Sequence, residues 1–565
     1  MTNPSSLDWR NRWGLSWVTG IRDQDPCEAC WDFAATALME SMVRINQGVW
    51  CIRSEGDPHD GMGAKCGSCG NADAALSWME TKDSSYPFGR GIADPDCYGW
   101  PDNRAGPYFN PAPNTCLGAS NYTGSTVAAN YDPTRDRSGR SVRVDSHVDI
   151  GNVNDQKTWL DTVGPLVCGF DVYDDFFSYG SGVYRKSSGA TYAGGHVMLV
   201  VGYDDTQGYW IVKNSWGSNW GMEGYVYIGY GECNIDNYAK TGVSLTNPDP
   251  WTKRRLHSGN ILESGDGANH RNFEMLVCKT RPPTPVQHWW RNNDVSGFPW
   301  SPASSFGNDL AVTFPTLTAT TFNRNFETVY LTSGKRLHHW YLDQNTGKWN
   351  DGGIFGPTDA VSGPGFIQSN YGAPGNFEVV VGTADKRLNH WWRDNSKSSY
   401  PWNDGGRFGS NVAYAGASLI QSNFGTKGNF ELVCTLQNGQ MQHWWRDNDD
   451  PNTPWAPSVT FGSNVKSGPC MIESMYGATN EYSKGNFELC VAVGGYVQHW
   501  WRDNNGNEAW TNSATFGDGR ITRVGGLLEG SFGFNLELIV ERDDGHIQHY
   551  YRDSSMLWHA AEVIV

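Results

Sequence analysis

The sequence predicts a multidomain chain in which a mixed α+β domain precedes an all-β array of six repeated units. Three observations carry this prediction. Residues 1 to about 248 of the 565 contain no internal repeat, and a helical pattern comes before their strand-like runs. A segment of the form Gln-His-Trp-Trp-Arg then recurs six times, with small changes. The chain also holds 67 Gly and 27 Trp, which favours β structure with tight turns.

These patterns divide the chain into a first domain at residues 1–248, a linker at 249–257 and a repeat domain at 258–565. The segment "NPDPWTKRRLHSG" is polar, basic and contains Pro, so the boundary is placed there. The net charge of -17 argues against a nucleic acid partner, which requires a basic surface. No run of 18 apolar residues predicts a membrane span, and no signal peptide is evident in the chain as given.

The first domain is predicted to start with a helix and to end with strands. "ACWDFAATALMESMVRI" has apolar residues at helical spacing, which places Cys30 near a helix N-terminus. The runs "VMLVVGYD", "GYWIVKNSWG" and "GYVYIGYG" are apolar and end in Gly or Asn, as strands do.

The second part is predicted to be a six-bladed β-propeller. Each unit of about 52 residues has an apolar run, an Asn-Phe-Glu strand, a His-aromatic strand and a following Trp, and its internal period is two. A helical solenoid would show a period of 3.6, and a β-trefoil would have three units. Neither fits.

The Cys27-Glu-Ala-Cys30 stretch has three interpretations. A redox pair would need a preceding strand in a βαβ context, but a loop precedes it. A four-cysteine zinc site would use Cys66 and Cys69 as the second pair. The third interpretation is a structural cysteine beside a nucleophile. A thiol at a helix N-terminus needs a base, a group that orients the base and an oxyanion donor. The candidates for these roles, in chain order, are Gln24, Cys30, His196 and Asn214.

Residues 7 to about 245 resemble the papain family of cysteine peptidases, on four motifs. These are "DQDPCEACWDF", "GGHVMLVVGYD", "KNSWG" and "NWGMEGYVYI", with Asn219 in place of the first Gly of the last run. The resemblance implies a papain-like fold in which Cys30 is the nucleophile and His196 the base. It further implies that Asn214 holds the imidazole, Trp216 shields that bond, and Gln24 forms the oxyanion hole with the Cys30 N–H.

The resemblance also implies a disulfide from Cys27 to Cys69 or Cys66, with Cys97 as partner of the other. It assigns no partner to Cys51, Cys116, Cys168 or Cys233. A substrate pocket is expected from Asn71, Ala72, Gly169, Gly194, Val197 and Tyr238, with Trp216 near the site. No acidic floor is evident in that pocket. No cofactor or metal is expected.

The repeated strand admits a structural and a binding interpretation. Structurally, the His, aromatic and Arg side chains pack between blades, and the Arg of most units pair with the buried Glu of Asn-Phe-Glu. Alternatively, repeated aromatic clefts bind sugars, and the repeat resembles tandem-repeat β-propeller lectins, including fucose-binding ones. The carbohydrate-binding candidates are Trp289, Trp340, Trp391, Trp444, Trp500 and Tyr550. A metal-binding ring of His288, His339, His390, His443, His499 and His549 in a central channel, or a glycosidase, are further alternatives.

The leading hypothesis is a secreted or extracellular cysteine endopeptidase that acts on protein or peptide substrates. Its propeller lectin would hold it at glycosylated surfaces, including fucosylated ones. The alternative is a lectin whose papain-like domain is inactive or acts as a transpeptidase. Disulfide pairing favours an oxidising compartment.

Overall fold

The computed structural model describes residues 3–25, 27–64, 66, 70–80, 91–100, 131–247, 249–278, 286–307, 309, 311–372 and 374–565. The chain forms two compact units. The N-terminal unit comprises residues 1–248 together with 479–481, and the C-terminal unit comprises 249–478 and 482–565. In the described residues, no helix has the length and apolar character needed to cross a membrane.

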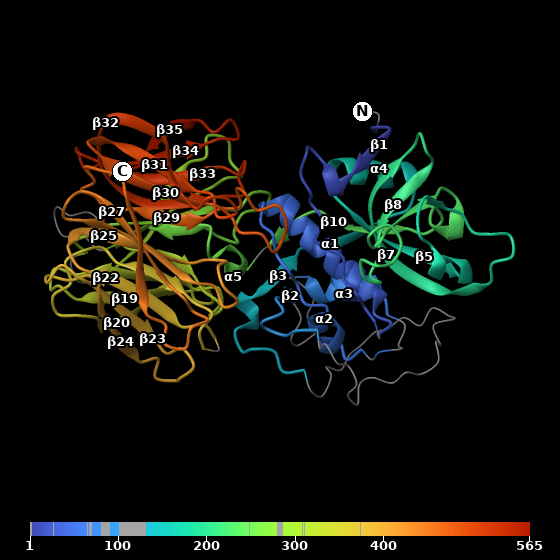
Figure 1. The fold of residues 1–565 in the computed structure, drawn as a ribbon, viewed down its shortest axis with the longest axis horizontal. Coiled ribbons are helices and arrows are strands. Elements are labelled where there is room, and N and C mark those ends of the chain that lie inside the picture. Colours follow the sequence, from blue (N-terminus) through green and yellow to red (C-terminus); the bar gives the residue numbers. More distant parts are fainter. Residues whose placement is uncertain are drawn as a thin grey trace. The chain divides into compact units, whose positions relative to one another are not determined.

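The N-terminal unit contains helices and two sheets (Figure 1). Its helices are η1 (Trp9–Asn11), α1 (Cys30–Gln47), α2 (Gly56–Gly61), α3 (Ala72–Met79), η2 (Arg137–Gly139), α4 (Val153–Thr162), η3 (Asp174–Ser178) and η4 (Glu232–Asn234). An eight-stranded sheet is built from β1 (Ser6–Asp8), β4 (His147–Ile150), β5 (Leu166–Tyr173), β6 (Val183–Tyr184), β7 (Tyr192–Asp204), β8 (Tyr209–Lys213), β9 (Tyr225–Gly229) and β10 (Lys240–Val243). A three-stranded sheet is built from β2 (Ile92–Ala93), β3 (Ser141–Val144) and β11 (Thr246–Asn247).

The large sheet runs in the order β4-β10-β5-β7-β8-β9-β6, and β1 pairs with β7. Helix α1 packs against β7, and nearly all of its side chains are buried. Such a helix is surrounded by protein rather than lying on the surface with one apolar stripe. It ends where Gly48 takes φ 70°, a left-handed conformation that glycine adopts without strain, and donates its N–H to the Arg44 carbonyl.

The C-terminal unit is built from antiparallel four-stranded repeats. Repeat 1 comprises β13 (Ile261–Glu263), β14 (Phe273–Val277), β15 (Val286–Arg291) and β16 (Trp300–Phe306). Repeat 2 comprises β17 (Thr318–Ala319), β18 (Phe326–Leu331), β19 (Leu337–Asp343) and β20 (Lys348–Phe355). Repeat 3 comprises β21 (Gly365–Gln368), β22 (Phe377–Gly382), β23 (Leu388–Arg393) and β24 (Trp402–Phe408). Repeat 4 comprises β25 (Val412–Gln421), β26 (Phe430–Leu436), β27 (Met441–Arg446) and β28 (Trp455–Phe461).

The last two repeats share one eight-stranded sheet, because the long strand β32 (Trp510–Glu529) runs through both. Repeat 5 comprises β29 (Cys470–Glu473), β30 (Phe487–Val493), β31 (Gly495–Arg502) and the first part of β32. Repeat 6 comprises the rest of β32, β33 (Leu536–Arg542), β34 (Ile547–Arg552) and β35 (Trp558–Val563). The segment expected to be a linker folds into this unit as α5 (Pro250–Lys253) and β12 (His257–Gly259), and Trp251 is buried.

Each repeat buries a His–Glu pair between its second and third strands. The Nε2–Oε2 distances are 2.9 Å for His288–Glu274, 2.6 Å for His339–Glu327, 2.8 Å for His390–Glu378, 2.8 Å for His443–Glu431, 2.6 Å for His499–Glu488 and 2.6 Å for His549–Glu537. The arginines were expected to pair with these glutamates, and one such pair exists, between Arg552 Nη2 and Glu488 Oε1 of the preceding repeat at 3.8 Å. Within a repeat, the carboxylate is held by His and not by Arg. The histidine occupies that carboxylate, because both side chains point to the same face of adjacent strands.

The arginine of the repeat has other partners. Arg393 Nε donates to Asn395 Oδ1 at 2.6 Å, and its guanidinium lies 3.9 Å from the centre of the Phe377 ring. Burial lowers the pKa of Arg393, and the Glu327 carboxylate of the preceding repeat opposes that shift. Equivalent hydrogen bonds join Arg291 to Asn293, Arg446 to Asn448 and Arg502 to Asn504.

Successive repeats meet through stacked aromatic rings. The Phe at the end of one repeat stacks on the Trp at or next to the start of the fourth strand of the next. The ring centres are 3.9 Å apart for Phe306–Trp349, 3.6 Å for Phe355–Trp402, 4.7 Å for Phe408–Trp455, 4.6 Å for Phe461–Trp510 and 4.4 Å for Phe516–Trp558. The same tryptophans also contact the buried His of the preceding repeat, as Trp455 contacts His390.

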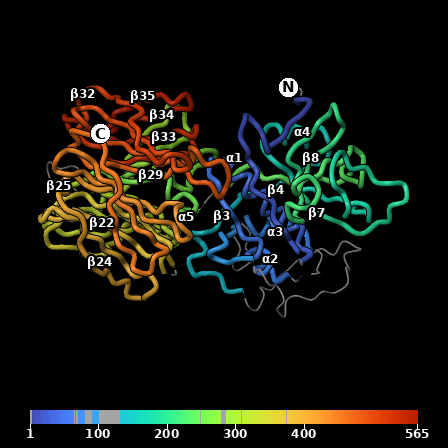
Figure 2. Tube along the Cα trace, in the orientation of Figure 1, coloured from blue at the N-terminus to red at the C-terminus, as the bar shows by residue number. Residues whose placement is uncertain are grey.

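Repeats 6 and 1 are in contact as well, although they lie at opposite ends of the unit's sequence (Figure 2). Strand β12 pairs with β32, Trp300 contacts His549, and Arg291 Nη1 lies 3.4 Å from His549 Nδ1. Strand β12 and segments at or before the start of repeats 2–6 also line one cavity of about 100 Å³. Its lining segments are 258–259, 313–316, 363–366, 415–419, 468–470 and 523–525. None of the six repeated histidines is among these residues, which argues against the alternative in which they line a central channel.

The Phe–Trp stacks should carry much of the stability of the C-terminal unit. Truncating Trp455 to Ala removes its stack with Phe408 and its contact with His390, and should cost about 3 kcal/mol of unfolding free energy. The matched control is Val459→Ala on the same strand, where the side chain is 50% exposed and the cost should be about 0.5 kcal/mol or less. Guanidinium unfolding followed by tryptophan fluorescence measures both, and equal costs would contradict a stabilising role of the stack.

Candidate active site

Cys30 is the first residue of α1 and is partly exposed. The preceding Ala29 caps the helix without a side-chain hydrogen bond, and its carbonyl accepts the N–H groups of Asp32 and Phe33. Burial raises the pKa of the Cys30 thiol to about 11, whereas backbone hydrogen bonds from Val197 and Trp31 lower it. The cost of desolvating an isolated thiolate is therefore larger than the stabilisation that the helix N-terminus gives it.

His196 lies on β7 and is 6% exposed. Its Nε2 is 2.8 Å from Asn214 Oδ1, and that same oxygen accepts the Ser215 N–H at 2.8 Å. A backbone N–H requires an acceptor, so this atom of Asn214 is the oxygen, and His196 must donate to it from Nε2. The other ring nitrogen, Nδ1, then carries the lone pair of the neutral imidazole. Burial lowers the pKa of His196 to about 4, and the hydrogen bond with Asn214 partly offsets this.

Aromatic rings cover this hydrogen bond. The Trp216 ring lies 4.7 Å from the His196 ring, and Phe177 stacks on Trp216 at 5.5 Å. Trp220 and the fully buried Phe176 pack against Trp216 from other directions. A hydrogen bond in such an apolar setting exchanges poorly with water, so the imidazole orientation is well defined.

Gln24 is fixed from both ends and is 8% exposed. Its backbone N–H donates to the Ser215 carbonyl at 2.9 Å, and its Oε1 accepts the Ser215 hydroxyl at 2.6 Å. Its Nε2 donates to the Cys27 carbonyl at 3.3 Å, so the amide N–H groups face the segment before Cys30. Ser215, which was not predicted as a site residue, thus fixes Gln24 and Asn214 relative to each other. The sequence feature that could have identified it is its position directly after Asn214.

The predicted substrate-pocket residues lie on separate elements. Asn71 caps α3 by accepting the Asp73 N–H at 2.8 Å, and the next residue, Ala72, is buried. Gly169 lies on β5, while Gly194 and Val197 lie on β7, where Gly194 has φ 147°.

Tyr238 covers Gly169, since a Cβ there would meet the Tyr238 ring at 3.4 Å. The Tyr238 hydroxyl donates to Asp171 Oδ1 at 2.9 Å, and the tyrosine is 40% exposed. The sequence predicted no acidic floor in this pocket. Asp171, whose carboxylate accepts the Tyr238 hydroxyl, was therefore not among the predicted residues.

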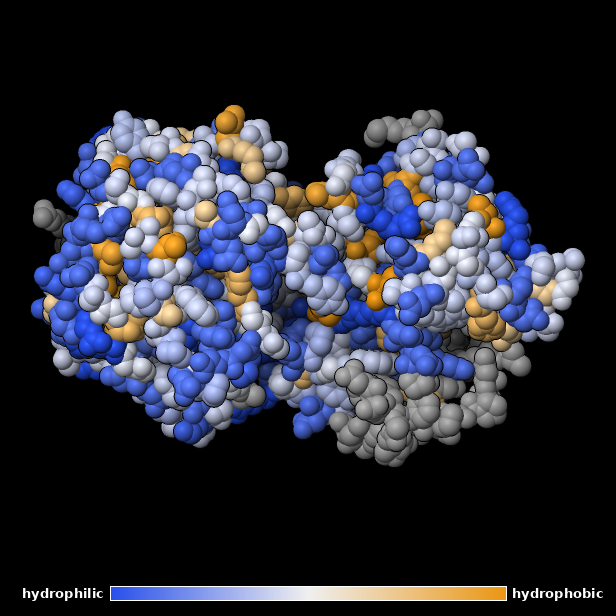
Figure 3. All heavy atoms as spheres, viewed as in Figure 1, coloured by the Kyte–Doolittle hydropathy of each residue, from blue (hydrophilic) through white to orange (hydrophobic). Residues whose placement is uncertain are grey.

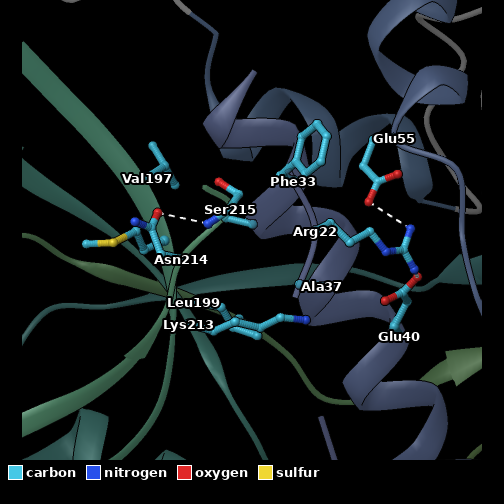
Figure 4. Close-up of a pocket in the computed structure, with 12 residues that line it drawn as sticks. Arg22, Phe33, Ala37, Glu40, Glu55, Val197, Leu199, Lys213, Asn214 and Ser215 are labelled. Carbon is cyan, nitrogen blue, oxygen red and sulfur yellow. Dashed lines mark hydrogen bonds and ion pairs between the residues drawn. The ribbon is translucent and has the colours of Figure 1, made fainter. Parts of the chain in front are cut away.

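A small cavity of about 20 Å³ lies behind the site, between α1 and strands β7 and β8 (Figure 4). Asn214 and Ser215 line it, but Cys30 and His196 do not. Its other wall carries charges: Arg22 binds Glu40 at 2.5 Å and Glu55 at 2.8 Å. Burial raises the pKa of Glu55 to about 6, an effect that Arg22 opposes. Lys213 also lines the cavity, and burial lowers its pKa to about 8.

Cys27 forms a disulfide with Cys66. Of the two partners expected for Cys27, Cys66 is therefore the one that the structure selects, and Cys69 lies outside the described residues, as does Cys116. Cys97 is a buried free thiol, so its expected disulfide is wrong. Its sulfur accepts the Thr134 hydroxyl at 3.1 Å, and burial raises its pKa to about 12.

Comparisons with known proteins concern the N-terminal unit. Residues 3–243 match the family model described as papain family cysteine protease. Cathepsin B-like cysteine proteinase 6 of Caenorhabditis elegans is 29% identical over 282 residues, which cover 46% of this chain and 72% of that protein. Pro-cathepsin H of Mus musculus is 29% identical over 237 residues, which cover 40% of this chain and 61% of that protein. The solved structure of proCathepsin B S9 from Trypanosoma congolense aligns with 43% of this chain and 79% of its own, at 24% identity and a TM-score of 0.33.

The buried imidazole predicts a pH-dependent stability. The folded pKa of His196, about 4, lies below its ordinary value of 6.5, so only the unfolded chain takes up this proton between those pH values. The contribution of His196 to the free energy of unfolding is complete above pH 6.5 and falls by about 3 kcal/mol as the pH falls to 4.

The variant His196→Gln removes this contribution. Its stability deficit relative to the wild type should therefore shrink on acidification from pH 7.5 to pH 4.5, as measured by urea unfolding at each pH. The matched control is Gln207→Ala in the exposed turn after β7, which should keep the wild-type slope. A deficit for His196→Gln that is constant with pH would contradict the neutral buried imidazole.

Proposed function

We propose that this chain, a cysteine peptidase with a papain-family domain at residues 3–243, is an endopeptidase that acts through Cys30, His196, Asn214 and Gln24. The observation that carries the proposal is the shared oxygen of Asn214. Because Oδ1 accepts both the Ser215 N–H and the His196 Nε2–H, the imidazole is left with a basic Nδ1. A base of that kind is what a cysteine nucleophile requires.

In the proposed mechanism, His196 Nδ1 takes the thiol proton as the Cys30 sulfur attacks the peptide carbonyl carbon. Burial disfavours an isolated thiolate and an isolated imidazolium, so the two charges form together as a pair. Gln24 Nε2 and the Cys30 N–H donate to the oxyanion. His196 then protonates the leaving amine, and the same base activates the water that hydrolyses the thioester.

We expect the Cys30 thiol to react once with an epoxysuccinyl inhibitor, with the adduct mapped to Cys30 by mass spectrometry. Cys30→Ala should abolish both the adduct and peptide hydrolysis. Gln24→Ala should lower kcat by about 10²–10³-fold, because one oxyanion donor is lost. Gln207→Ala serves as the surface control and should keep the wild-type kcat.

Two results would contradict these roles. A Gln24→Ala enzyme with unchanged kcat would remove Gln24 from the oxyanion hole. A wild-type protein without adduct or hydrolysis would favour the alternative, a lectin with an inactive domain. If an added amine appears in the product in place of water, the domain acts as a transpeptidase instead.

For the C-terminal unit, we propose a six-bladed β-propeller. Six antiparallel four-stranded repeats have the same internal order, and equivalent contacts recur between neighbours. Two observations support ring closure: repeat 6 contacts both β12 and repeat 1, and β12 lines one cavity together with segments of repeats 2–6. Propellers place their first strands around a central channel in this manner.

We further propose that this unit binds glycans through its repeated aromatic side chains and so directs the peptidase to glycosylated, including fucosylated, surfaces. The visible face of the unit is largely hydrophilic with small apolar spots (Figure 3), which suits polar ligands that stack on single rings. Among the first aromatics, Trp340, Trp444 and Tyr550 are buried, whereas Trp289, Trp391 and Trp500 are partly exposed. The second aromatic can be more accessible: Trp445 is 37% exposed and Trp444 only 9%.

The Cys27–Cys66 disulfide supports a secreted or extracellular location, because such bonds persist in oxidising compartments. Several weak sites on one propeller would gain avidity on a glycan-coated surface.

A glycan array probed with the full chain, as the inactive Cys30→Ala variant, tests the lectin proposal. Binding should fall for Trp391→Ala, a partly exposed candidate, and for Trp445→Ala if the second aromatic contributes. The matched control is Tyr414→Ala, an exposed aromatic outside the His-aromatic strands. No binding to any glycan would contradict glycan recognition while leaving the peptidase assignment intact.

A further inference from the structure

A second cluster of reactive side chains lies close to the start of α1 but is not used in peptide hydrolysis. It consists of Cys27, His59 and Cys66, whose ligand atoms all lie within 4.8 Å of one another. All three residues are buried, with exposed fractions of 2%, 1% and 4%. In the described part of the chain, this is the one group of three or more such residues that are spaced to hold a metal ion.

The spacing within the cluster matches zinc coordination. His59 Nε2 lies 3.6 Å from Cys27 Sγ. A tetrahedral zinc with bonds of about 2.3 Å to sulfur and about 2.05 Å to nitrogen places those two ligand atoms about 3.6 Å apart. The same geometry requires about 3.8 Å between two thiolate sulfurs, which reduction of the disulfide permits.

A carboxylate already orients the imidazole as it does in metal sites. His59 Nδ1 lies 2.7 Å from Asp60 Oδ1, and Asp60 Oδ2 accepts the Tyr98 hydroxyl at 2.6 Å. With Nδ1 as donor to Asp60, Nε2 carries the lone pair and faces the Cys27 sulfur. Histidines that bind metals usually donate their other ring N–H to a carboxylate in this way, which fixes the tautomer and raises the basicity of the ligand nitrogen.

Aromatic rings surround the cluster and limit access of water. Trp31 stacks over His59 with ring centres 6.1 Å apart, and Trp100 contacts the edges of both His59 and Phe33. Phe33 and Ala29 pack on the two cysteines. Two thiolates in such a setting are costly unless a cation neutralises them, and Zn²⁺ does so with no net charge left on the ZnS₂N group.

We propose that the reduced protein binds Zn²⁺ through Cys27, Cys66 and His59, so that a metal ion replaces the disulfide. The bond is first reduced by a dithiol: the dithiol is oxidised to its disulfide, and Cys27 and Cys66 each become a thiol. Zn²⁺ then displaces the two thiol protons, which pass to solvent, and water takes the fourth position. The cross-link over 39 residues is thereby kept in reducing surroundings.

The zinc cross-link would also hold the adjacent segment of the candidate active site in place, although the inference does not rest on the proposed function. The Cys27 carbonyl accepts Gln24 Nε2 at 3.3 Å and the Ala29 N–H at 2.8 Å, so Cys27 ties Gln24 to the beginning of α1. Cys30 must be a thiol to act as a nucleophile, and any reductant that keeps it so can also reduce the Cys27–Cys66 disulfide. A bound Zn²⁺ ion would keep this segment in place under those conditions.

Co²⁺ is the probe for the test, because cobalt bound by thiolates gives an intense near-ultraviolet charge-transfer band and tetrahedral visible bands. The full chain is used as Cys30→Ala, which removes the catalytic thiol from competition. After reduction with dithiothreitol and anaerobic desalting, we expect one Co²⁺ per chain, displaced by one Zn²⁺. The unreduced protein should give no band. Within this background, His59→Gln and Cys66→Ser should lose the band, and the matched thiol control Cys97→Ser should keep it.

A second measurement covers the case in which Cys66→Ser fails to fold. Zn²⁺ should protect Cys27 and Cys66 of the reduced Cys30→Ala chain from alkylation, as mapped by mass spectrometry, without protecting Cys97. Two results would overturn the proposal. One is a reduced chain that binds no Co²⁺. The other is a thiolate band that survives in His59→Gln, together with alkylation of Cys27 and Cys66 that Zn²⁺ does not slow.

Discussion

The geometry of the candidate active site depends on one oxygen atom, Asn214 Oδ1. It accepts the N–H of the next residue, Ser215, and the Nε2–H of His196. The first bond fixes which end of the Asn amide faces the imidazole, and the second fixes which imidazole nitrogen remains basic. Ser215 then extends the same constraint to Gln24, whose Oε1 accepts its hydroxyl. His196 and Gln24, the proposed base and oxyanion donor, are therefore held by two adjacent residues directly after β8.

Desolvation sets the electrostatic character of this arrangement. Burial raises the pKa of Cys30 and lowers that of His196, so each charge is costly when it forms alone. In the proposed mechanism the two charges form together, and each then offsets the cost of the other. The nearby cluster of Arg22, Glu40 and Glu55 follows the same rule, because its buried carboxylates are paired with a guanidinium.

The sequence allowed prediction of elements whose signal is local. Helix α1 begins at Cys30 as its apolar spacing indicates, and repetition of one strand motif predicted six similar four-stranded units. The predictions that failed concern pairs of side chains that strand register brings together. Glu378 binds His390 rather than Arg393, since the cross-strand geometry brings the first two side chains together on one face. Likewise, no pattern in the sequence indicated that Tyr238 would bring its hydroxyl to Asp171, or that Cys97 would be a buried free thiol.

The repeats also show how one interface can be varied without loss of the arrangement. In most repeats an Arg of the third strand lies over a Phe and close to an aromatic loop residue of the preceding repeat, as Arg446 does with Phe430 and Tyr371. Repeat 2 carries Leu342 at that position, and Leu342 joins the apolar cluster that it shares with repeat 1. Among the described residues, no Phe–Trp stack joins repeats 6 and 1. Ile564, Val565, Trp289 and Trp300 pack there against one apolar cluster that the two repeats share. An apolar contact thus replaces a cation–π or stacked pair at two junctions. Apolar burial between neighbouring sheets is therefore the common requirement, and the aromatic and Arg side chains are one means of meeting it.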